Sequence, residues 1–190
     1  MPGKDMQEMV GWLKANPDKA SAGIFSTGMR VLTELFQKET GTHFAIVPYS
    51  GNAPVLQDLL AGHIDLSFDN LLQLPQVRAG SIKAYAITSD SRSALAPDIP
   101  TFREMGLPSV SYLPWWALFA PKGTPSDIIA RLNRAAVETV ADATVRSRLA
   151  ELSFEVVPRE QQTPQALFAM QKADAEKWLP LIKEFGISAE

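Results

Sequence analysis

The residues best suited to chemistry are small and polar, and they stand where the sequence predicts helices to begin. Ser26 and Thr27 precede one predicted helix, and the turn Gly51-Asn52-Ala53 opens the next. The first backbone N–H groups of a helix have no partner within it, so such turns can hold an anion together with nearby hydroxyls. We therefore predict that these residues bind a small acid. Plain helix capping and tight-turn formation remain the structural alternatives.

A second polar pair, Asp69 and Asn70, ends the next apolar segment. A carboxylate repels an anion, so we expect Asp69 to accept a hydrogen bond from a ligand ammonium, a ligand hydroxyl or a bound water. Capping of the helix predicted to begin at Leu71 is an equal alternative for Asp69. Tyr49 is predicted to wall the same pocket, and Asp65, inside the apolar segment, is assigned a structural role.

Catalytic and metal-binding chemistry has little support in the sequence. General acid–base catalysis needs a second titratable group near Asp69, and none is evident. His43 and His63 lie next to turns, lack metal-ligand spacing and are predicted to be surface residues. Cysteine is absent, which excludes disulfides and thiolate ligands. We predict a binding protein with no catalytic residue, no metal and no cofactor.

Composition is that of an ordinary globular chain. The 190 residues, 46% hydrophobic and 21% charged, suit one domain or two small lobes. The 18 basic and 21 acidic residues give a net charge of −3 and form no basic stripe, which argues against nucleic acid or an anionic membrane as partner. The N-terminus has no basic or apolar region of a secretory signal, and no apolar stretch approaches the roughly 20 residues that span a bilayer.

Strands and helices are predicted to alternate through the first 88 residues. The predicted elements are helix 5–15 with Asp5 as its cap, strand 19–24, helix 28–40, strand 44–48, helix 53–61, strand 64–68, helix 71–79 and strand 82–88. Such alternation with short connections predicts a mostly parallel sheet covered on both faces. Ligands of these sheets bind beyond the carboxyl ends of the strands, where we expect the turns at 23–27, 50–53 and 69–70 to meet.

The remainder of the chain is predicted to be loop-rich and then mainly helical. A short helix at 101–105 and an apolar extended segment at 110–120 precede helices at 126–140, 142–151 and 163–184, with a short strand at 154–157. A lobe boundary is placed near 110–117. Trp115 and Trp116 are adjacent and point to opposite faces of an extended segment, so one is expected to be core.

Several long motifs resemble one family, the periplasmic substrate-binding proteins of tripartite tricarboxylate transporters, often called Bug-type receptors. The order and spacing match along almost the whole chain. The matching stretches are SAGIFST (21–27), VPYSGNAPVLQDLLAGHIDLSFDN (47–70), IKAYAIT (82–88), PDIPTFREMGLP (97–108), WWALFAPKGTP (115–125), IIARLN (128–133) and KWLPLIKEFGI (177–187).

The resemblance implies an α/β fold of the periplasmic-binding-protein type (type II, a Venus flytrap), with one complete lobe and an incomplete first lobe. Residues 1–113 would be the ligand-binding second lobe and residues 114–190 the mainly helical C-terminal part of the first. The family's opening strand and Pro-Gly-Gly loop have no counterpart here, and Met29-Arg30 stands where the family usually has His. The remaining first-lobe helices are therefore expected to expose apolar surface, leading to a homodimer, a complementary fragment or poor solubility.

The implied function is a periplasmic receptor, not an enzyme, that captures a small carboxylate or related polar metabolite and presents it to membrane transporter subunits. The resemblance strengthens the assignment of Ser26 and Thr27 and favours Trp115 as the tryptophan that lines the cleft. Two alternatives remain open. The chain could be a truncated scaffold or interaction fragment without a working ligand site, or an enzyme such as a small hydrolase, whose turnover would depend on Asp69.

Overall fold

The computed structural model describes residues 3–152 and 154–187. The chain divides into two compact units, Met1–Leu113 together with Leu181–Glu190, and Pro114–Pro180. The outer ends of the two predicted domains, residues 1 and 190, lie outside the described residues. That these units correspond to the lobes named above stays a prediction.

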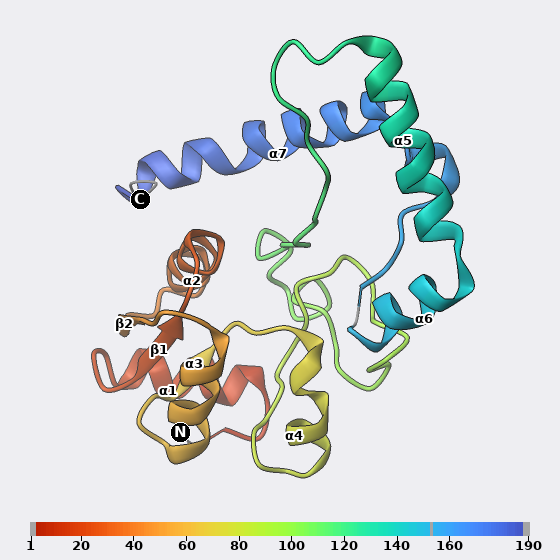
Figure 1. The fold of residues 1–190 in the computed structure, drawn as a ribbon. Helices are drawn as coiled ribbons and strands as arrows, with labels where there is room; N and C mark the ends of the chain where they lie inside the picture. Colours follow the sequence, from red (N-terminus) through yellow and green to blue (C-terminus); the bar gives the residue numbers. More distant parts are fainter. Residues whose placement is uncertain (1–2, 153, 188–190) are drawn as a thin grey trace. The chain divides into compact units, whose positions relative to one another are not determined.

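A three-stranded parallel sheet lies in the first unit (Figure 1). Its strands are β1 (Ser21–Ile24), β2 (Ala45–Pro48) and β3 (Leu66–Ser67), in the order β2-β1-β3. Ser21 pairs with Ala45, and Ala22 pairs with Leu66. The predicted parallel sheet is therefore confirmed, with β1 as its central strand.

The helices of the first unit begin and end at the residues that local signals favour. They are α1 (Met6–Ala15), α2 (Thr27–Thr40), α3 (Asn52–Ala61), the 3-10 turn η1 (Leu71–Gln73) and α4 (Leu74–Arg78). The Asp5 side chain accepts a hydrogen bond of 2.9 Å from the Glu8 N–H at the start of α1. Gly41 and Gly62 end α2 and α3 with φ of 63° and 74°, a conformation that glycine adopts without steric cost.

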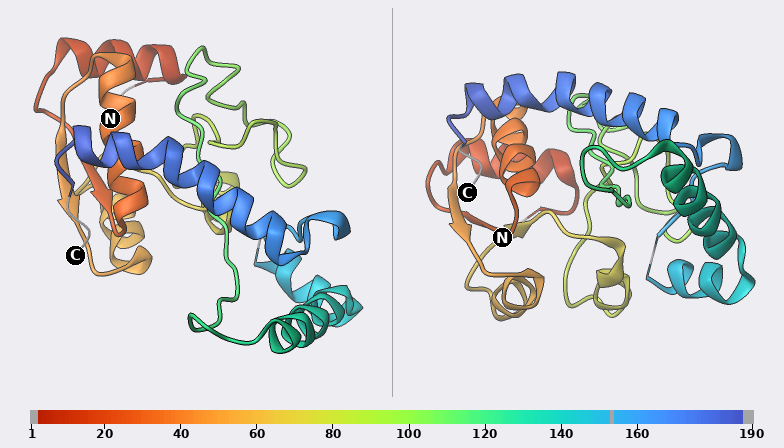
Figure 2. Two further views of the ribbon diagram at one scale, coloured as in Figure 1. Left: turned by 90° about the horizontal axis from the view of Figure 1, so that it is seen from above. Right: turned by 45° about the horizontal axis from the view of Figure 1, so that its top comes forward.

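The second unit is helical in its described part. It contains α5 (Ser126–Ala141), α6 (Ala143–Glu151), the 3-10 turn η2 (Arg159–Gln161) and most of α7 (Pro164–Glu184). Figure 2 shows α7 as one continuous blue helix. The unit boundary falls after Pro180, inside α7, where proline lacks the N–H that would continue the helical hydrogen bonds.

The hydrophobic core is concentrated in the first unit. It includes an aromatic cluster in which Phe36 of α2 contacts the rings of Phe44, Phe68 and Phe102, with centroids 6.1 to 6.4 Å apart. Among the described residues, Val137 is the one buried apolar side chain that lies in the second unit. The two units therefore differ greatly in how much apolar surface each buries within itself.

Four predicted elements are absent or much shorter in the structure, and the predicted helix 71–79 is divided into η1 and α4. The predicted strand 82–88 is absent, because only Ile87 pairs, in an isolated bridge with Thr101. The predicted helix 101–105 is a single turn, which Gly106 ends with φ of 81°. Strand 64–68 shortens to the two residues of β3, and residues 154–157 form no strand. The three strands were predicted from a local apolar pattern, but no partner strand continues along their whole length. The predicted helix is too short to extend beyond one turn.

Candidate functional site

Three polar turns follow the three strands at one edge of the sheet. Because β1, β2 and β3 are parallel, their carboxyl ends point the same way. The Tyr49 N–H donates to the Ile24 carbonyl at 2.8 Å and so extends the pairing of β1 with β2 to this edge. The predicted convergence of the turns that follow these strands is therefore present in the first unit.

The turn after β1 presents an exposed hydroxyl at a helix start. Ser26 caps α2, because its Oγ accepts a hydrogen bond from the Met29 N–H at 3.3 Å. Thr27 is the first residue of α2, and both side chains are exposed. Ser26 Oγ is therefore engaged in capping, as the structural alternative predicted, and it stays accessible from solvent.

The turn after β2 leaves a helix start without a side-chain cap. Gly51 precedes α3 and has extended backbone, and an added Cβ there would meet no atom within 4 Å. Asn52 and Ala53 are the first two residues of α3. Their N–H groups belong to the first turn, where the helix offers no acceptor. Open space over an uncapped helix start is the geometry that admits an anion.

The turns after β2 and β3 are joined by a direct contact. Asn52 Nδ2 donates to Asp69 Oδ1 at 3.0 Å, and the Asn70 N–H donates to the same oxygen at 2.7 Å. Two buried acceptor atoms at this contact, Asn52 Oδ1 and Asp69 Oδ2, have no hydrogen-bond partner among the described residues. Burial raises the pKa of Asp69, and hydrogen bonds from the Asn70 N–H and from the Asn52 and Gln73 side chains offset this shift only in part.

The structure settles the alternative role of Asp69 as a helix cap. Asn70, not Asp69, caps the 3-10 turn η1, because Asn70 Oδ1 accepts from the Leu72 N–H at 2.9 Å. The capping role predicted as an equal alternative for Asp69 is therefore wrong. Asp65 has the predicted structural role, since its Oδ2 accepts from the Ser21 N–H at 3.0 Å and so ties β3 to β1.

Tyr49 is fixed by its hydroxyl. Tyr49 Oη donates to Asp58 Oδ2 at 2.7 Å, and His63 Nδ1 lies 3.2 Å from Asp58 Oδ1. The hydrogen bond from Tyr49 and then that from His63 lower the pKa of Asp58. The Tyr49 ring lies close to Gly23, because its Cε2 would be 3.3 Å from a Cβ added there, and the Tyr49 hydroxyl is committed to Asp58 of α3. That Tyr49 walls a ligand pocket stays a prediction.

One residue near this edge was missed by the sequence analysis. A Cβ added to Gly28 would lie 2.8 Å from Tyr112 Oη, so the Tyr112 hydroxyl sits over the first turn of α2. Thr88 Oγ1 donates to the Tyr112 carbonyl at 2.7 Å and helps to hold this segment in place. The only signal available was the Gly at position 28, which lets a side chain approach the helix closely.

The predicted tryptophan lies in the other unit. Trp115 Nε1 donates to Asp174 Oδ2 of α7, and Trp115 is half-buried. Trp116 is 69% exposed, with its ring against that of Phe154 at 4.4 Å between centroids. The expectation that one of the two is core is therefore wrong. That Trp115 lines a ligand cleft stays a prediction.

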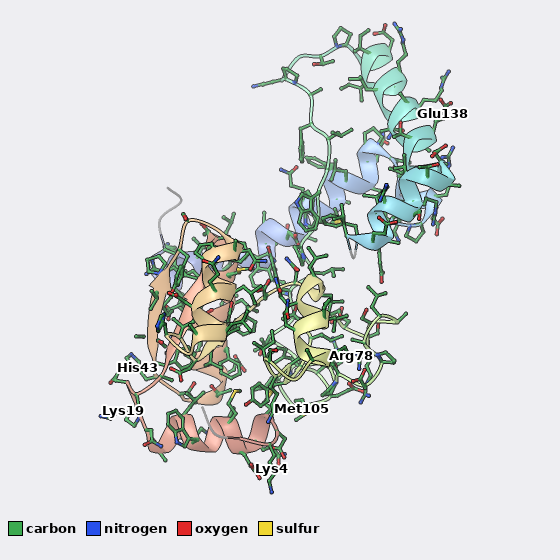
Figure 3. All side chains as sticks on the ribbon, turned by 60° about the horizontal axis from the view of Figure 1, so that its bottom comes forward. Lys4, Lys19, His43, Arg78, Met105 and Glu138 are labelled. Carbon is green, nitrogen blue, oxygen red and sulfur yellow. The ribbon has the colours of Figure 1, made fainter. Side chains whose placement is uncertain are left out.

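The two histidines lie on the surface, as predicted. His43 Nδ1 is 2.6 Å from Asp18 Oδ1, and Figure 3 labels His43 near Lys19, at the amino ends of β1 and β2. Within residues 3–152 and 154–187, no group of three or more His, Asp or Glu side chains is placed to hold a metal ion. No helix in that part of the chain is long and apolar enough to cross a bilayer.

The second unit contains a cavity of about 730 Å³ that the sequence analysis did not anticipate. It lies between α5 and the start of α7, and its lining includes Arg134 and Arg159. The lining also includes Gln162, whose buried Oε1 has no hydrogen-bond partner among the described residues. None of the predicted ligand-binding residues lines this cavity.

Comparison with known sequences identifies relatives along the whole chain. The profile of the tripartite tricarboxylate transporter family receptor matches residues 1–187. A UPF0065 protein encoded in the TAR-I ttuE-ttuC' intergenic region of Agrobacterium vitis is 34% identical over 96% of this chain. Protein BugT of Bordetella pertussis is 32% identical over 95% of it. The chain spans about half the length of these curated relatives, 54% and 56%.

Solved structures show the same likeness in three dimensions. The periplasmic binding protein BugD superimposes with a TM-score of 0.86 at 30% identity, covering 100% of this chain and 64% of that one. MatC of Rhodopseudomonas palustris, with bound malate, has a TM-score of 0.83 at 32% identity over 95% of this chain and 63% of its own. A further R. palustris protein, with adipate, has a TM-score of 0.81 at 28% identity over 99% of this chain and 63% of its own. The α/β fold is therefore that of periplasmic binding proteins.

Proposed function

The chain belongs to the tripartite tricarboxylate transporter receptor family, and we propose that it acts as a solute-binding receptor for a small carboxylate. Two structural neighbours carry dicarboxylates, malate and adipate. The receptor would work in the periplasm, like the periplasmic binding protein BugD. It would deliver its ligand to membrane transporter subunits, as its family membership suggests. It would bind its ligand without transforming it.

The observation that carries this proposal is the contact between the turns after β2 and β3. The uncapped start of α3 offers the N–H groups of Asn52 and Ala53 to a carboxylate. Asp69 Oδ2, buried and without a partner among the described residues, lies at the contact between the same two turns. A ligand with a carboxylate for α3 and a hydroxyl or ammonium for Asp69 would satisfy both groups at once.

The remaining predicted residues have supporting roles in this proposal. Ser26 and Thr27 would offer hydroxyls from the neighbouring helix start, and Asn70 would orient Asp69 through its N–H. Tyr49 would supply an apolar wall. Because helix dipoles and hydroxyls are neutral groups, this arrangement accepts several acids, and selectivity would come from Asp69.

The test is the substitution Gly51→Asp, which separates ligand binding from stability. The new carboxylate caps α3 by accepting from the Ala53 N–H, so we expect the unfolding free energy to stay the same or to rise by about 0.5 kcal/mol. The same carboxylate occupies the proposed anion site and repels a second anion. We expect calorimetric binding of malate or adipate to weaken by more than about tenfold.

Pro125→Asp is the matched control, because Pro125 precedes α5 and also gives no side-chain cap. This substitution adds the same charge and the same kind of cap in the second unit, and binding should not change. If Gly51→Asp binds these acids as well as the unaltered chain, the site is not at α3. A chain that binds no acid of any class would favour the alternative of an interaction fragment.

A further inference from the structure

The cavity of about 730 Å³ in the second unit has charges of one sign on its wall. Arg134 of α5 and Arg159 of η2 both line it, and none of the described residues that line it is acidic. The chain as a whole carries a net charge of −3, so the lining is opposite in sign to the whole chain. The volume of the cavity lies in the range of sites that hold small molecules. A hollow with positive walls raises the local concentration of anions.

The two arginines of the cavity have no carboxylate partner in the described part of the chain. Arg148 of the same unit pairs with Glu151 at 2.7 Å. Neither Arg134 nor Arg159 makes an ion pair or a side-chain hydrogen bond with any residue between 3 and 152 or between 154 and 187. A guanidinium group has five N–H donors in a planar arrangement that fits the oxygens of an anion. The cavity wall therefore offers two groups of donors to a ligand.

The amide side chains on the cavity wall are held in place by hydrogen bonds. Asn133 Nδ2 donates to the Gln162 carbonyl at 3.1 Å and so joins α5 to the residues that precede α7. Gln162 Nε2 donates to the Val157 carbonyl at 2.7 Å. The acceptors left on these two amides are Asn133 Oδ1 and Gln162 Oε1, and the latter has no partner among the described residues. A ligand hydroxyl is a donor of the kind that these acceptors require.

The charges on the wall favour a phosphate monoester over a simple carboxylate. One arginine satisfies both oxygens of a carboxylate through a bidentate contact. A phosphate monoester carries a charge of about −1.5 to −2 at neutral pH and has three acceptor oxygens, so it can pair with two arginines at once. Its organic part would lie against Ile129 and Val137, which belong to the apolar part of the lining.

We propose that the cavity between α5 and the start of α7 is a second ligand site, which binds a small phosphate monoester that carries a hydroxyl group. Arg134 and Arg159 would pair with the phosphate oxygens, and Asn133 and Gln162 would accept hydrogen bonds from the hydroxyl. This site goes beyond the proposed receptor function, because none of the residues assigned to the carboxylate site lines the cavity. Binding would also stabilise the second unit, because the ligand would connect α5 to η2.

The experiment is calorimetric titration of the chain with glycerol phosphate, followed by amide hydrogen exchange with and without this compound. We expect saturable binding at one site, and slower exchange in residues 158–165 when glycerol phosphate is present. Methyl phosphate, which has no hydroxyl group, should bind about fivefold more weakly. An excess of malate should not displace glycerol phosphate.

Arginine substitutions assign the binding to this cavity. Arg134→Gln and Arg159→Gln each remove one positive charge and keep a long polar side chain. Each should weaken the binding of glycerol phosphate by about tenfold or more. Arg131→Gln is the matched control, because Arg131 is an exposed residue of the same helix α5 and is not part of the cavity lining. It removes the same charge, and affinity should change by less than about twofold.

The variant Gly51→Asp separates this site from the one at α3. Its new charge lies in the first unit, so glycerol phosphate should bind to it as tightly as to the unaltered chain. Failure of the unaltered chain to bind malate or adipate would count against the receptor function and would leave the binding of glycerol phosphate unaffected.

Four results would overturn the proposal. An unaltered chain that does not bind glycerol phosphate would show that the cavity is not a site for this class of ligand. Equal affinity in Arg134→Gln, Arg159→Gln and the unaltered chain would exclude contact with the two arginines. Loss of binding in Gly51→Asp would place the phosphate at α3. Displacement of glycerol phosphate by malate would make a dicarboxylate, and not a phosphate monoester, the ligand of the cavity.

Discussion

Asp69 combines burial with a free acceptor atom, and this makes it the most informative side chain of the candidate site. Burial raises its pKa from 3.8 because the ionised carboxylate loses hydration. The protonated form is therefore favoured more in the folded state than in the unfolded chain. Its contribution to stability is present below the pKa of the unfolded chain and is lost as pH rises through the raised pKa of the folded chain.

The substitution Asp69→Asn should remove this loss. We expect the variant to unfold at higher urea concentration than the unaltered chain at neutral pH, and the difference to disappear well below pH 3.8, where the Asp69 carboxyl is neutral in the folded and the unfolded chain. Urea unfolding across this pH interval measures the effect. Equal stability of the two chains at neutral pH would contradict it.

Asp98 serves as a control, because its pKa is shifted in the opposite direction to that of Asp69. The hydrogen bonds from Arg78 lower the pKa of Asp98. Its contribution to stability is therefore present above the pKa of the unfolded chain and is lost as pH falls through the lowered pKa. Asp98→Asn should be slightly less stable than the unaltered chain at neutral pH, because this exposed pair is screened by solvent.

Close packing of α3 on β1 depends on the absence of a side chain at Gly23. A Cβ there would lie 2.6 Å from Ile64 Cδ1 and 3.0 Å from Val55 Cγ1, and both of these side chains are buried. This packing sets the position of α3, and therefore of the uncapped helix start that the proposed function uses.

We expect Gly23→Ala to lower the unfolding free energy by about 1–3 kcal/mol through overpacking. Ile64→Val removes the closest atom, so the double variant should be less destabilised than the sum of the two single variants. Gly11→Ala is the control, because nothing lies within 4 Å of a Cβ on that exposed face of α1. Additive losses in the double variant would show that the contact with Ile64 is not the cause.

Elements with local signals at both ends could be predicted from the sequence. The helix at 27–40 has Ser26 at its start and Gly41 at its end, and the structure places both as caps. The strand at 82–88 had an apolar pattern but depends on a distant partner, and Thr101 provides only one bridge. Capping is decided within a few residues, whereas strand pairing depends on tertiary contacts that one sequence does not reveal.

In the candidate site too, features set by the order of elements could be predicted, whereas features set by contacts between side chains of different elements could not. Parallel strand order predicted that the turns after the strands would share an edge. The bond from Asn52 to Asp69, and the commitment of the Tyr49 hydroxyl to Asp58, depend on side-chain positions between elements. Tyr112 was missed because it comes near α2 only through the path of a long loop.

The unequal cores of the two units predict unequal stability. The first unit buries many apolar side chains, among them Leu13, Leu32 and Val55, whereas Val137 is the one that the described part of the second unit buries. Because apolar burial is the main favourable contribution to folding, local opening should require less free energy in the second unit.

We expect amide hydrogen exchange to show this difference directly. The amides of α5 should exchange faster than those of α2, although both helices are long and well formed. Val137→Ala should accelerate exchange in α5 further and leave α2 unchanged. The cavity that this substitution creates weakens only the packing of the residues around position 137. Leu32→Ala is the counterpart and should destabilise the first unit by about 2–5 kcal/mol. Equal protection of α5 and α2 in the unaltered chain would mean that the second unit gains stability from contacts other than its own buried side chains.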